Sequence, residues 1–177
     1  IVRFQGTHHM FYGPNHIRVA TSTDLMNWTP RGTVFEAGGS ARDPNVLQIG
    51  GAYHMTYCID DRVEARTSED LRHWSEPRTV LRMPTGIAPE SPCLMAHDGT
   101  FYLFVCGWDG NWGRTTVQGA YQHKTWVYQS DDPGRFTREV ATLQAHAPEV
   151  IRSEDGRWYI SSAEWPERGV SLAEMVW

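Results

Sequence analysis

The stretch ARDPNVLQIGGAYHMTYC, residues 41–58, decides the fold because it occurs again as PESPCLMAHDGTFYLFVC, residues 89–106. Five positions correspond at a single offset of 48 residues: Pro44 and Pro92, Gly51 and Gly99, Tyr53 and Phe101, Thr56 and Phe104, and Cys58 and Cys106. An internal repeat of this length predicts a chain assembled from copies of one supersecondary unit.

The same unit occurs twice more. Near the start of the chain, Gly6 and Tyr12 precede Gly51 and Tyr57 by 45 residues, and HAPEVIRSEDGRWYISS (146–162) repeats the proline, the glycine and the aromatic residue. The second half of the unit recurs as TSTDLMNW (21–28), TSEDLRHW (67–74) and QSDDPGRF (129–136). Each repeat therefore contains an apolar strand, a glycine turn, an aromatic strand, a third strand ending in S-x-D, and a further aromatic residue.

This pattern predicts an all-β protein. Strand-sized apolar runs are bounded by Gly, Pro, Asn and Asp, and no helical stripe persists over three turns. Repeats of about fifty residues predict a β-propeller of four-stranded antiparallel blades. We place the repeats at approximately 1–38, 39–85, 86–143 and 144–177, in one domain. The proline that opens the other repeats has no counterpart before Ile1, so we expect a five-bladed ring whose first blade another segment or chain supplies.

Composition excludes several classes of partner. The net charge is −5, and Lys and Arg are scattered along the sequence, so no nucleic-acid surface is expected. No apolar run is long enough to span a membrane, and no feature indicates a cellular location. The three cysteines are predicted to be buried thiols. No His, Asp or Glu cluster has the spacing of metal ligands, so neither a metal nor a cofactor is expected.

The residues that open the repeats carry the candidate chemistry. In a propeller the innermost strands line the central channel, so residues just before these strands converge at one mouth. The side chains predicted there are Arg42, Asp43, Glu90, His146 and Glu149. Two carboxylates facing one pocket are what glycoside hydrolysis requires. Each acid taken alone is typical of a turn residue. Their equivalent places in successive repeats instead favour catalysis by Asp43 and Glu90. We expect Arg42, His146 and Glu149 to contact the substrate.

The third repeat is longer than the second, and its extra residues lie in GWDGNWGRTTVQGAYQHK, residues 107–124. A loop rich in glycine and aromatic residues is typical of a cover over a sugar site. Trp108 and Trp112 are therefore predicted to stack on a sugar ring, with packing of the loop as the alternative role.

The motifs RDP (42–44), E-x-P (90–92) and HAPEV (146–150) resemble the RDP, ECP and YAPQ motifs of glycoside hydrolase family 32, the invertases and fructanases. The wider relatives are families 68 and 43, which share a five-bladed propeller. The resemblance implies that Asp43 stabilises the transition state, that Glu90 is the general acid/base, and that Arg42 braces the substrate or Asp43.

The chain departs from that family in two ways. Ser91 replaces the usual Cys, and Cys93 stands where Asp is common. The family nucleophile is an Asp in an N-D-P motif that this sequence lacks, and we expect it on the missing first blade. In the family 43 pattern a first-blade Asp is instead the base and an A-P-D motif tunes a pKa, a role that HAPEV would give to Glu149. That assignment would change the outcome from retention to inversion.

The sequence thus predicts a glycosidase that cleaves furanoside linkages, of fructose or arabinose, in an oligosaccharide or polysaccharide. A non-catalytic carbohydrate-binding propeller is the alternative. A protein-interaction propeller is disfavoured because no W-D signature recurs from repeat to repeat and no kelch signature is present.

Overall fold

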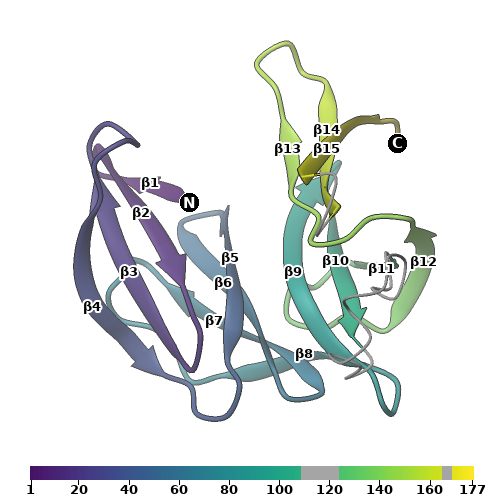
Figure 1. Ribbon diagram of the computed structural model, residues 1–177, viewed down its shortest axis with the longest axis horizontal. Helices are drawn as coiled ribbons and strands as arrows, with labels where there is room; N and C mark the ends of the chain where they lie inside the picture. The colour runs from purple at the N-terminus through teal and green to yellow at the C-terminus, as the bar shows by residue number, and fades with distance from the viewer. Residues whose placement is uncertain (109–123, 165–168) are drawn as a thin grey trace.

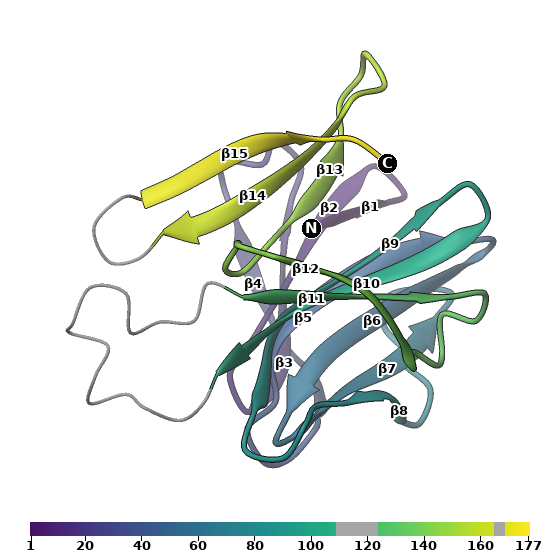
Figure 2. The same ribbon diagram turned by 90° about the vertical axis from the view of Figure 1, so that its right-hand side faces the viewer.

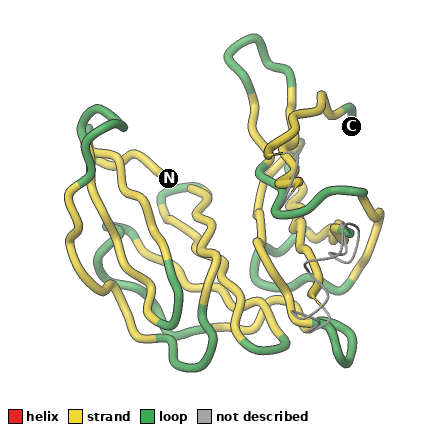
Figure 3. The backbone as a smooth tube through the Cα atoms, in the orientation of Figure 1, coloured by secondary structure: helices red, strands yellow, loops and turns green. Residues whose placement is uncertain are grey.

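The computed structural model describes residues 1–108, 124–164 and 169–177. These residues form strands, turns and loops and contain no helix (Figure 3). Accordingly, the described part of the chain contains no helix able to cross a membrane.

The strands form four antiparallel sheets, which we call blades 1 to 4 in chain order. Blade 1 contains β1 (Val2–Phe4), β2 (Thr7–Tyr12), β3 (His16–Ser22) and β4 (Thr29–Glu36). Blade 2 contains β5 (Arg42–Ile49), β6 (Ala52–Ile59), β7 (Arg62–Ser68) and β8 (Arg78–Arg82). Blade 3 contains β9 (Ala88–His97), β10 (Thr100–Trp108), β11 (Thr125–Ser130) and β12 (Arg138–Leu143). Blade 4 contains β13 (Val150–Arg152), β14 (Trp158–Glu164) and β15 (Gly169–Met175).

The predicted all-β propeller is confirmed. Within each blade, strands that follow one another in the sequence are hydrogen-bonded neighbours, as in a meander. Figures 1 and 2 show the four blades following one another in space, with blades 1 and 2 on the left of Figure 1 and blades 3 and 4 on the right. Blade 4 differs from the prediction because it has three strands in the described residues. The Trp177 ring, which follows β15, stacks on His97 of blade 3 with a centroid distance of 4.4 Å.

Three apolar clusters hold consecutive blades together. Between blades 1 and 2, Ile17 and Tyr57 are fully buried. Between blades 2 and 3, Val63 and Leu103 are fully buried, and between blades 3 and 4 Phe104 packs with the partly buried Ile160 and Trp158. Burying each large apolar side chain stabilises the fold by about 1.5–3 kcal/mol, so a blade depends on its neighbours for most of its core.

The repeated S-x-D-L sequence is a hydrogen-bonded turn after the third strand. In blade 2 the Ser68 hydroxyl accepts the N–H of Asp70 (3.2 Å) and Leu71 (2.9 Å). The Asp70 carboxylate then accepts the N–H of Arg72 and His73, both at 2.8 Å. Ser22 and Asp24 make the same turn in blade 1. This local bonding explains why the motif recurs without any catalytic role.

Gly107 provides a test of the packing between blade strands. A Cβ at this position would collide with the ring of Trp126 and lie 2.7 Å from Cγ2 of Ile87. We expect Gly107→Ala to lower the free energy of unfolding by about 1–3 kcal/mol, the usual cost of overpacking. Urea unfolding measures the change. Gly51→Ala is the control, because a Cβ there meets no heavy atom within 4 Å; equal losses in both variants would contradict the packing described.

The turn aspartates predict a pH dependence of stability. The pKa of Asp70 is held well below its usual value because its carboxylate accepts hydrogen bonds from the His73 N–H, the His73 ring and the Arg72 N–H. A depressed folded-state pKa stabilises the fold above the unfolded-state pKa, about 4, and this contribution disappears as the pH falls through the folded-state pKa.

Asp70→Asn should therefore lower the urea midpoint at pH 7, and its difference from the wild type should shrink as the pH falls below about 4. The control is Asp131→Asn, an exposed position in the blade 3 turn where Asp132 makes the turn bond to Gly134. A difference that grows in acid would contradict this account.

Candidate active site

Arg42, Asp43 and Glu90 lie together where the inner strands of blades 2 and 3 begin. Arg42 Nε is 3.9 Å from Oδ2 of Asp43 and 3.8 Å from Oε1 of Glu90. The Glu90 side chain is 13% exposed and that of Asp43 is 36% exposed. One guanidinium thus lies between two carboxylates that come from adjacent blades, which allows both carboxylates to remain close without a full repulsion penalty.

A β-bulge at each strand start positions these acids. The pairing of β5 with β6 shifts register between Arg42 and Asn45, and the pairing of β9 with β10 shifts at the matching place. The residue before the proline has a left-handed φ in all three blades: 54° at Asp43, 47° at Ser91 and 48° at Ala147. Bulges of this kind redirect side chains away from the regular pleat.

This register corrects the expectation that the two acids occupy equivalent places in successive repeats. Asp43 directly precedes its proline and corresponds to Ser91 and Ala147, whereas Glu90 corresponds to Arg42 and His146. The motif residues Asp43 and Glu90 also lie within β5 and β9, rather than in loops ahead of these strands. The two carboxylates therefore approach each other from different positions of the repeat.

Hydrogen bonds between the blades hold the site. The N–H of Ser91 donates to Asp43 Oδ2 at 3.0 Å. Arg42 donates through Nη2 to the Pro89 carbonyl at 2.8 Å and through Nη1 to the Ser40 carbonyl at 3.1 Å. Charge-assisted bonds of this type fix orientation as well as distance. The guanidinium of Arg42 consequently joins the two blades and both carboxylates.

Buried thiols form the floor behind these groups. Cys58 pairs across the sheet with Arg42, and Cys106 pairs with Glu90. Burial raises the pKa of Cys58, and the negative charge of Asp43 raises it further. Burial also raises the pKa of Cys106, to about 11. Both thiols are therefore neutral at pH 7, and all three cysteines are free, so they serve as packing groups rather than nucleophiles.

A cavity of about 440 Å³ opens beside Asp43. It is lined by Phe11, Tyr12, Gly13, Pro14, Arg42, Asp43 and Pro44. The turn at Gly13 approaches blade 2 so closely that a Cβ there would lie 3.2 Å from the Cα of Arg42. Sequence reasoning missed Tyr12 as a lining residue. The Gly-Pro dipeptide that follows it signals a turn, but nothing in it indicates which blade the turn meets.

The other predicted site residues have the following surroundings. His146 is buried, and its N–H donates to the Ser162 hydroxyl at 3.0 Å. Trp108 ends β10, half-buried and opposite Ala88. Trp112 lies outside the described residues.

Glu149 occupies a different position of the repeat from both acids. It follows Pro148 as Asn45 follows Pro44 and Cys93 follows Pro92. Asn45 Oδ1 accepts the N–H of Leu94 at 3.1 Å, and Cys93 Sγ accepts the N–H of Val150 at 3.4 Å, so this position bridges successive blades. Glu149 as a whole residue is exposed, but partial desolvation of its carboxylate raises its pKa, against the opposing effects of the chain's amino terminus and the Cys93 thiol.

Among residues 1–108, 124–164 and 169–177, no three His, Cys, Asp or Glu side chains are placed to hold a metal ion together. The carboxylates and the guanidinium of the described site can transfer a proton and stabilise positive charge on a ligand.

A propeller with two acids beside an arginine suits a carbohydrate-processing protein, and comparison with known proteins identifies the family. Residues 37–176 match the model of glycosyl hydrolases family 43, so the chain belongs to that family. The sequence motifs indicated family 32 first and family 43 among its wider relatives, and the family model that matches is that of family 43. No curated protein sequence matches the chain.

Solved structures share the fold at low sequence identity. An exo-1,5-α-L-arabinanase from a bovine ruminal metagenomic library has a TM-score of 0.74 and 19% identity, over 100% of this chain and 73% of its own. A Bombyx mori family 32 β-fructofuranosidase has a TM-score of 0.75 and 16% identity, over 98% and 46%. An exo-β-1,3-galactanase from Phanerochaete chrysosporium has a TM-score of 0.65 and 15% identity, over 94% and 43%. The chain thus spans less than half of the last two proteins.

Removing the Arg42 charge tests its position between the acids. We expect Arg42→Met to lower the free energy of unfolding at pH 7 by about 1–3 kcal/mol, because charged hydrogen bonds are lost and two carboxylates face each other uncompensated. The deficit should shrink in acid, because a protonated carboxyl group no longer repels a neighbouring carboxylate. The control is Arg78→Met, which breaks an exposed 3.4 Å ion pair with Asp132 and should cost less than about 1 kcal/mol. A deficit independent of pH would contradict this electrostatic role.

Proposed function

We propose that this chain supplies two of the catalytic carboxylates of a glycosidase that cleaves furanoside linkages. Glu90 is the general acid/base, and Asp43 stabilises the transition state by holding sugar hydroxyls. The observation that carries the proposal is the shared contact with Arg42, which brings carboxylates from two blades to one place. Membership of glycosyl hydrolases family 43 supports the reaction class.

The different surroundings of the two acids suit different roles. Glu90 is the less exposed, and a carboxyl shielded from water is the better candidate to deliver a proton to the glycosidic oxygen. Asp43 is more exposed and lines the 440 Å³ cavity, while the Ser91 N–H fixes one of its oxygens. A carboxylate fixed in this way can accept hydrogen bonds from a sugar that enters the cavity. Such bonds strengthen as the ring gains oxocarbenium character.

The reaction also needs a carboxylate that attacks the sugar or activates water. The proposal assigns this role to an aspartate outside residues 1–177, on a further blade. Glu149, with its raised pKa, is the described residue that would take the tuning role in the family 43 pattern. The assay below therefore uses the protein that includes the further blade.

The furanoside preference rests on two lines of support. The family 32 resemblance of the RDP and E-x-P motifs favours fructosides, and an exo-1,5-α-L-arabinanase and a β-fructofuranosidase share the fold. Tyr12, beside Asp43 in the cavity, offers an aromatic face for a sugar ring.

Hydrolysis assays test the proposal. The substrates are sucrose, inulin, levan and two aryl arabinofuranosides, one with a good and one with a poor leaving group. We expect Glu90→Gln to lower kcat by a factor on the order of 100 or more on the poor leaving group. The loss should be much smaller on the good one, which needs little protonation. Asp43→Asn should impair both to a similar degree, because transition-state stabilisation does not depend on the leaving group.

The control is Glu76→Gln, an exposed acid in the blade 2 turn region, which should retain full activity. Equal losses on both leaving groups in Glu90→Gln would remove Glu90 from the acid role. No turnover by the unaltered protein, with sugar binding retained, would instead establish a carbohydrate-binding propeller without catalysis.

A further inference from the structure

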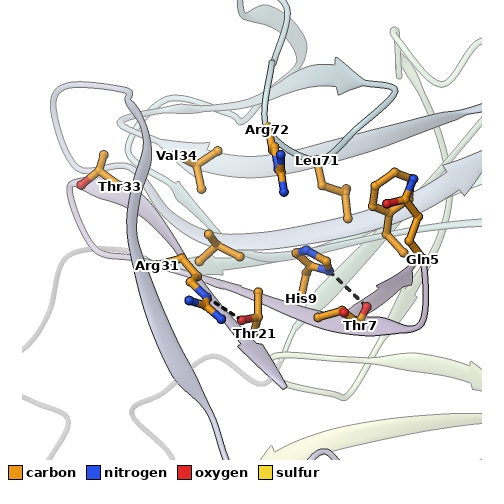
Figure 4. Close-up of a pocket in the computed structure, with 11 residues that line it drawn as sticks. Gln5, Thr7, His9, Thr21, Arg31, Thr33, Val34, Leu71 and Arg72 are labelled. Carbon is orange, nitrogen blue, oxygen red and sulfur yellow. Dashed lines mark hydrogen bonds between the residues drawn. The ribbon is translucent and has the colours of Figure 1, made fainter. Parts of the chain in front are cut away.

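A cavity of about 550 Å³ lies between blades 1 and 2, and none of the residues that line it belongs to the candidate active site. We call it the basal cleft. It is lined by Phe4, Gln5, Thr7, His9, Val19, Thr21, Arg31, Thr33, Val34, Leu71 and Arg72 (Figure 4). Gln5 belongs to the β1–β2 turn, and Leu71 and Arg72 to the turn after β7. The opposite end of β2 leads to the Gly13 turn that meets Arg42, so the cleft and the site lie at opposite ends of the blades.

The charge of the basal cleft is opposite to that of the chain. The sequence has 21 acidic and 16 basic residues, yet no Asp or Glu lines the cleft, whereas Arg31 and Arg72 both do. Figure 4 shows Arg72 entering from the blade 2 side and Arg31 from the blade 1 side, and His9 is a further lining residue. The carboxylate of the neighbouring Asp70 is engaged with the N–H groups of its own turn and with the His73 ring. Positive charge therefore gathers here without a lining carboxylate.

A hydrogen bond orients the guanidinium of Arg31, and a turn bond fixes the backbone of Arg72. Arg31 Nε donates to the Thr21 hydroxyl at 2.8 Å, which orients the guanidinium along β4 and leaves its two terminal amino groups for a ligand. The backbone of Arg72 is fixed because its N–H donates to Asp70 at 2.8 Å. A pre-oriented guanidinium loses little freedom on binding a planar or tetrahedral oxyanion.

His9 and the apolar residues complete the lining. Burial lowers the pKa of His9, the hydrogen bond with the Thr7 carbonyl opposes this, and the nearby Arg72 charge lowers it again. His9 is therefore neutral at pH 7. Phe4, Val19, Val34 and Leu71 supply an apolar surface, and Thr7, Thr21 and Thr33 supply hydroxyls. Apolar walls with a few polar groups are typical of small-molecule sites.

We propose that the basal cleft binds a small oxyanionic ligand, either the carboxylate of an acidic sugar or a phosphate group, between Arg31 and Arg72. The ring of an acidic sugar would rest on the apolar surface while its hydroxyls meet the threonines. The site is separate from Asp43 and Glu90, and it stands or falls independently of the proposed glycosidase activity.

Calorimetric titration of the protein with glucuronate, inorganic phosphate and glucose tests the proposal. We expect one or both anions to bind and glucose not to bind. Arg31→Gln and Arg72→Gln should each weaken anion binding at least about tenfold, the effect of losing charged hydrogen bonds, and the double variant should abolish it. Tighter binding of glucuronate identifies the sugar acid as the ligand class, and tighter binding of phosphate identifies the phosphate group.

Two controls separate this site from others. Arg135→Gln makes the same charge change at an exposed position of blade 3 and should leave anion binding unchanged. Glu90→Gln should also bind anions as the unaltered protein does, even where it loses hydrolysis. The absence of binding by both anions, equal affinity for glucose and glucuronate, or unchanged affinity in the Arg31/Arg72 double variant, with thermal unfolding showing each variant folded, would overturn the proposal.

Discussion

The bonds between the inner strands of blades 2 and 3 are the constraint on which the candidate site depends. Arg42 reaches the Pro89 carbonyl, the Ser91 N–H reaches Asp43, and Asn45 receives the Leu94 N–H. These bonds join residues 47 to 49 positions apart, so the second repeat is tied to the third at matching places. Without these bonds, the bulged starts of β5 and β9 would not be fixed relative to each other. Two acids from different blades would then not share one arginine.

Much of the fold follows from local chemistry that a sequence displays. Glycine turns, strand-sized aromatic runs and the S-x-D turn are set by neighbouring residues, which is why their repetition indicated the blades. The packing of Trp177 was not predicted, because the sequence after Trp158 shows strand-forming residues but does not show what this last side chain contacts. Its stacking on His97 is a contact across 80 residues, and such contacts have no local signature.

The candidate site, too, was predicted only in part from the sequence. The motifs at residues 42–44 and 90–92 pointed to Arg42, Asp43 and Glu90, and the structure brings these three together. The left-handed backbone at Asp43, Ser91 and Ala147 was not predicted. None of these residue types requires a positive φ. The proline that follows each of them disfavours a helical backbone but does not specify a left-handed one. Backbone strain of this kind is often found where side chains must be aimed at a ligand. The basal cleft was missed because Arg31 and Arg72 are far apart in sequence and belong to different blades.

Two of the three cysteines can report on the motion of the blades. Cys58 is buried in the cluster between blades 2 and 3, and Cys93 in the cluster between blades 3 and 4. Neither thiol can meet a reagent in solution unless the corresponding interface opens. The chain therefore carries a natural reporter at each of these two interfaces, and the rate at which each thiol is alkylated measures how often that pair of blades separates.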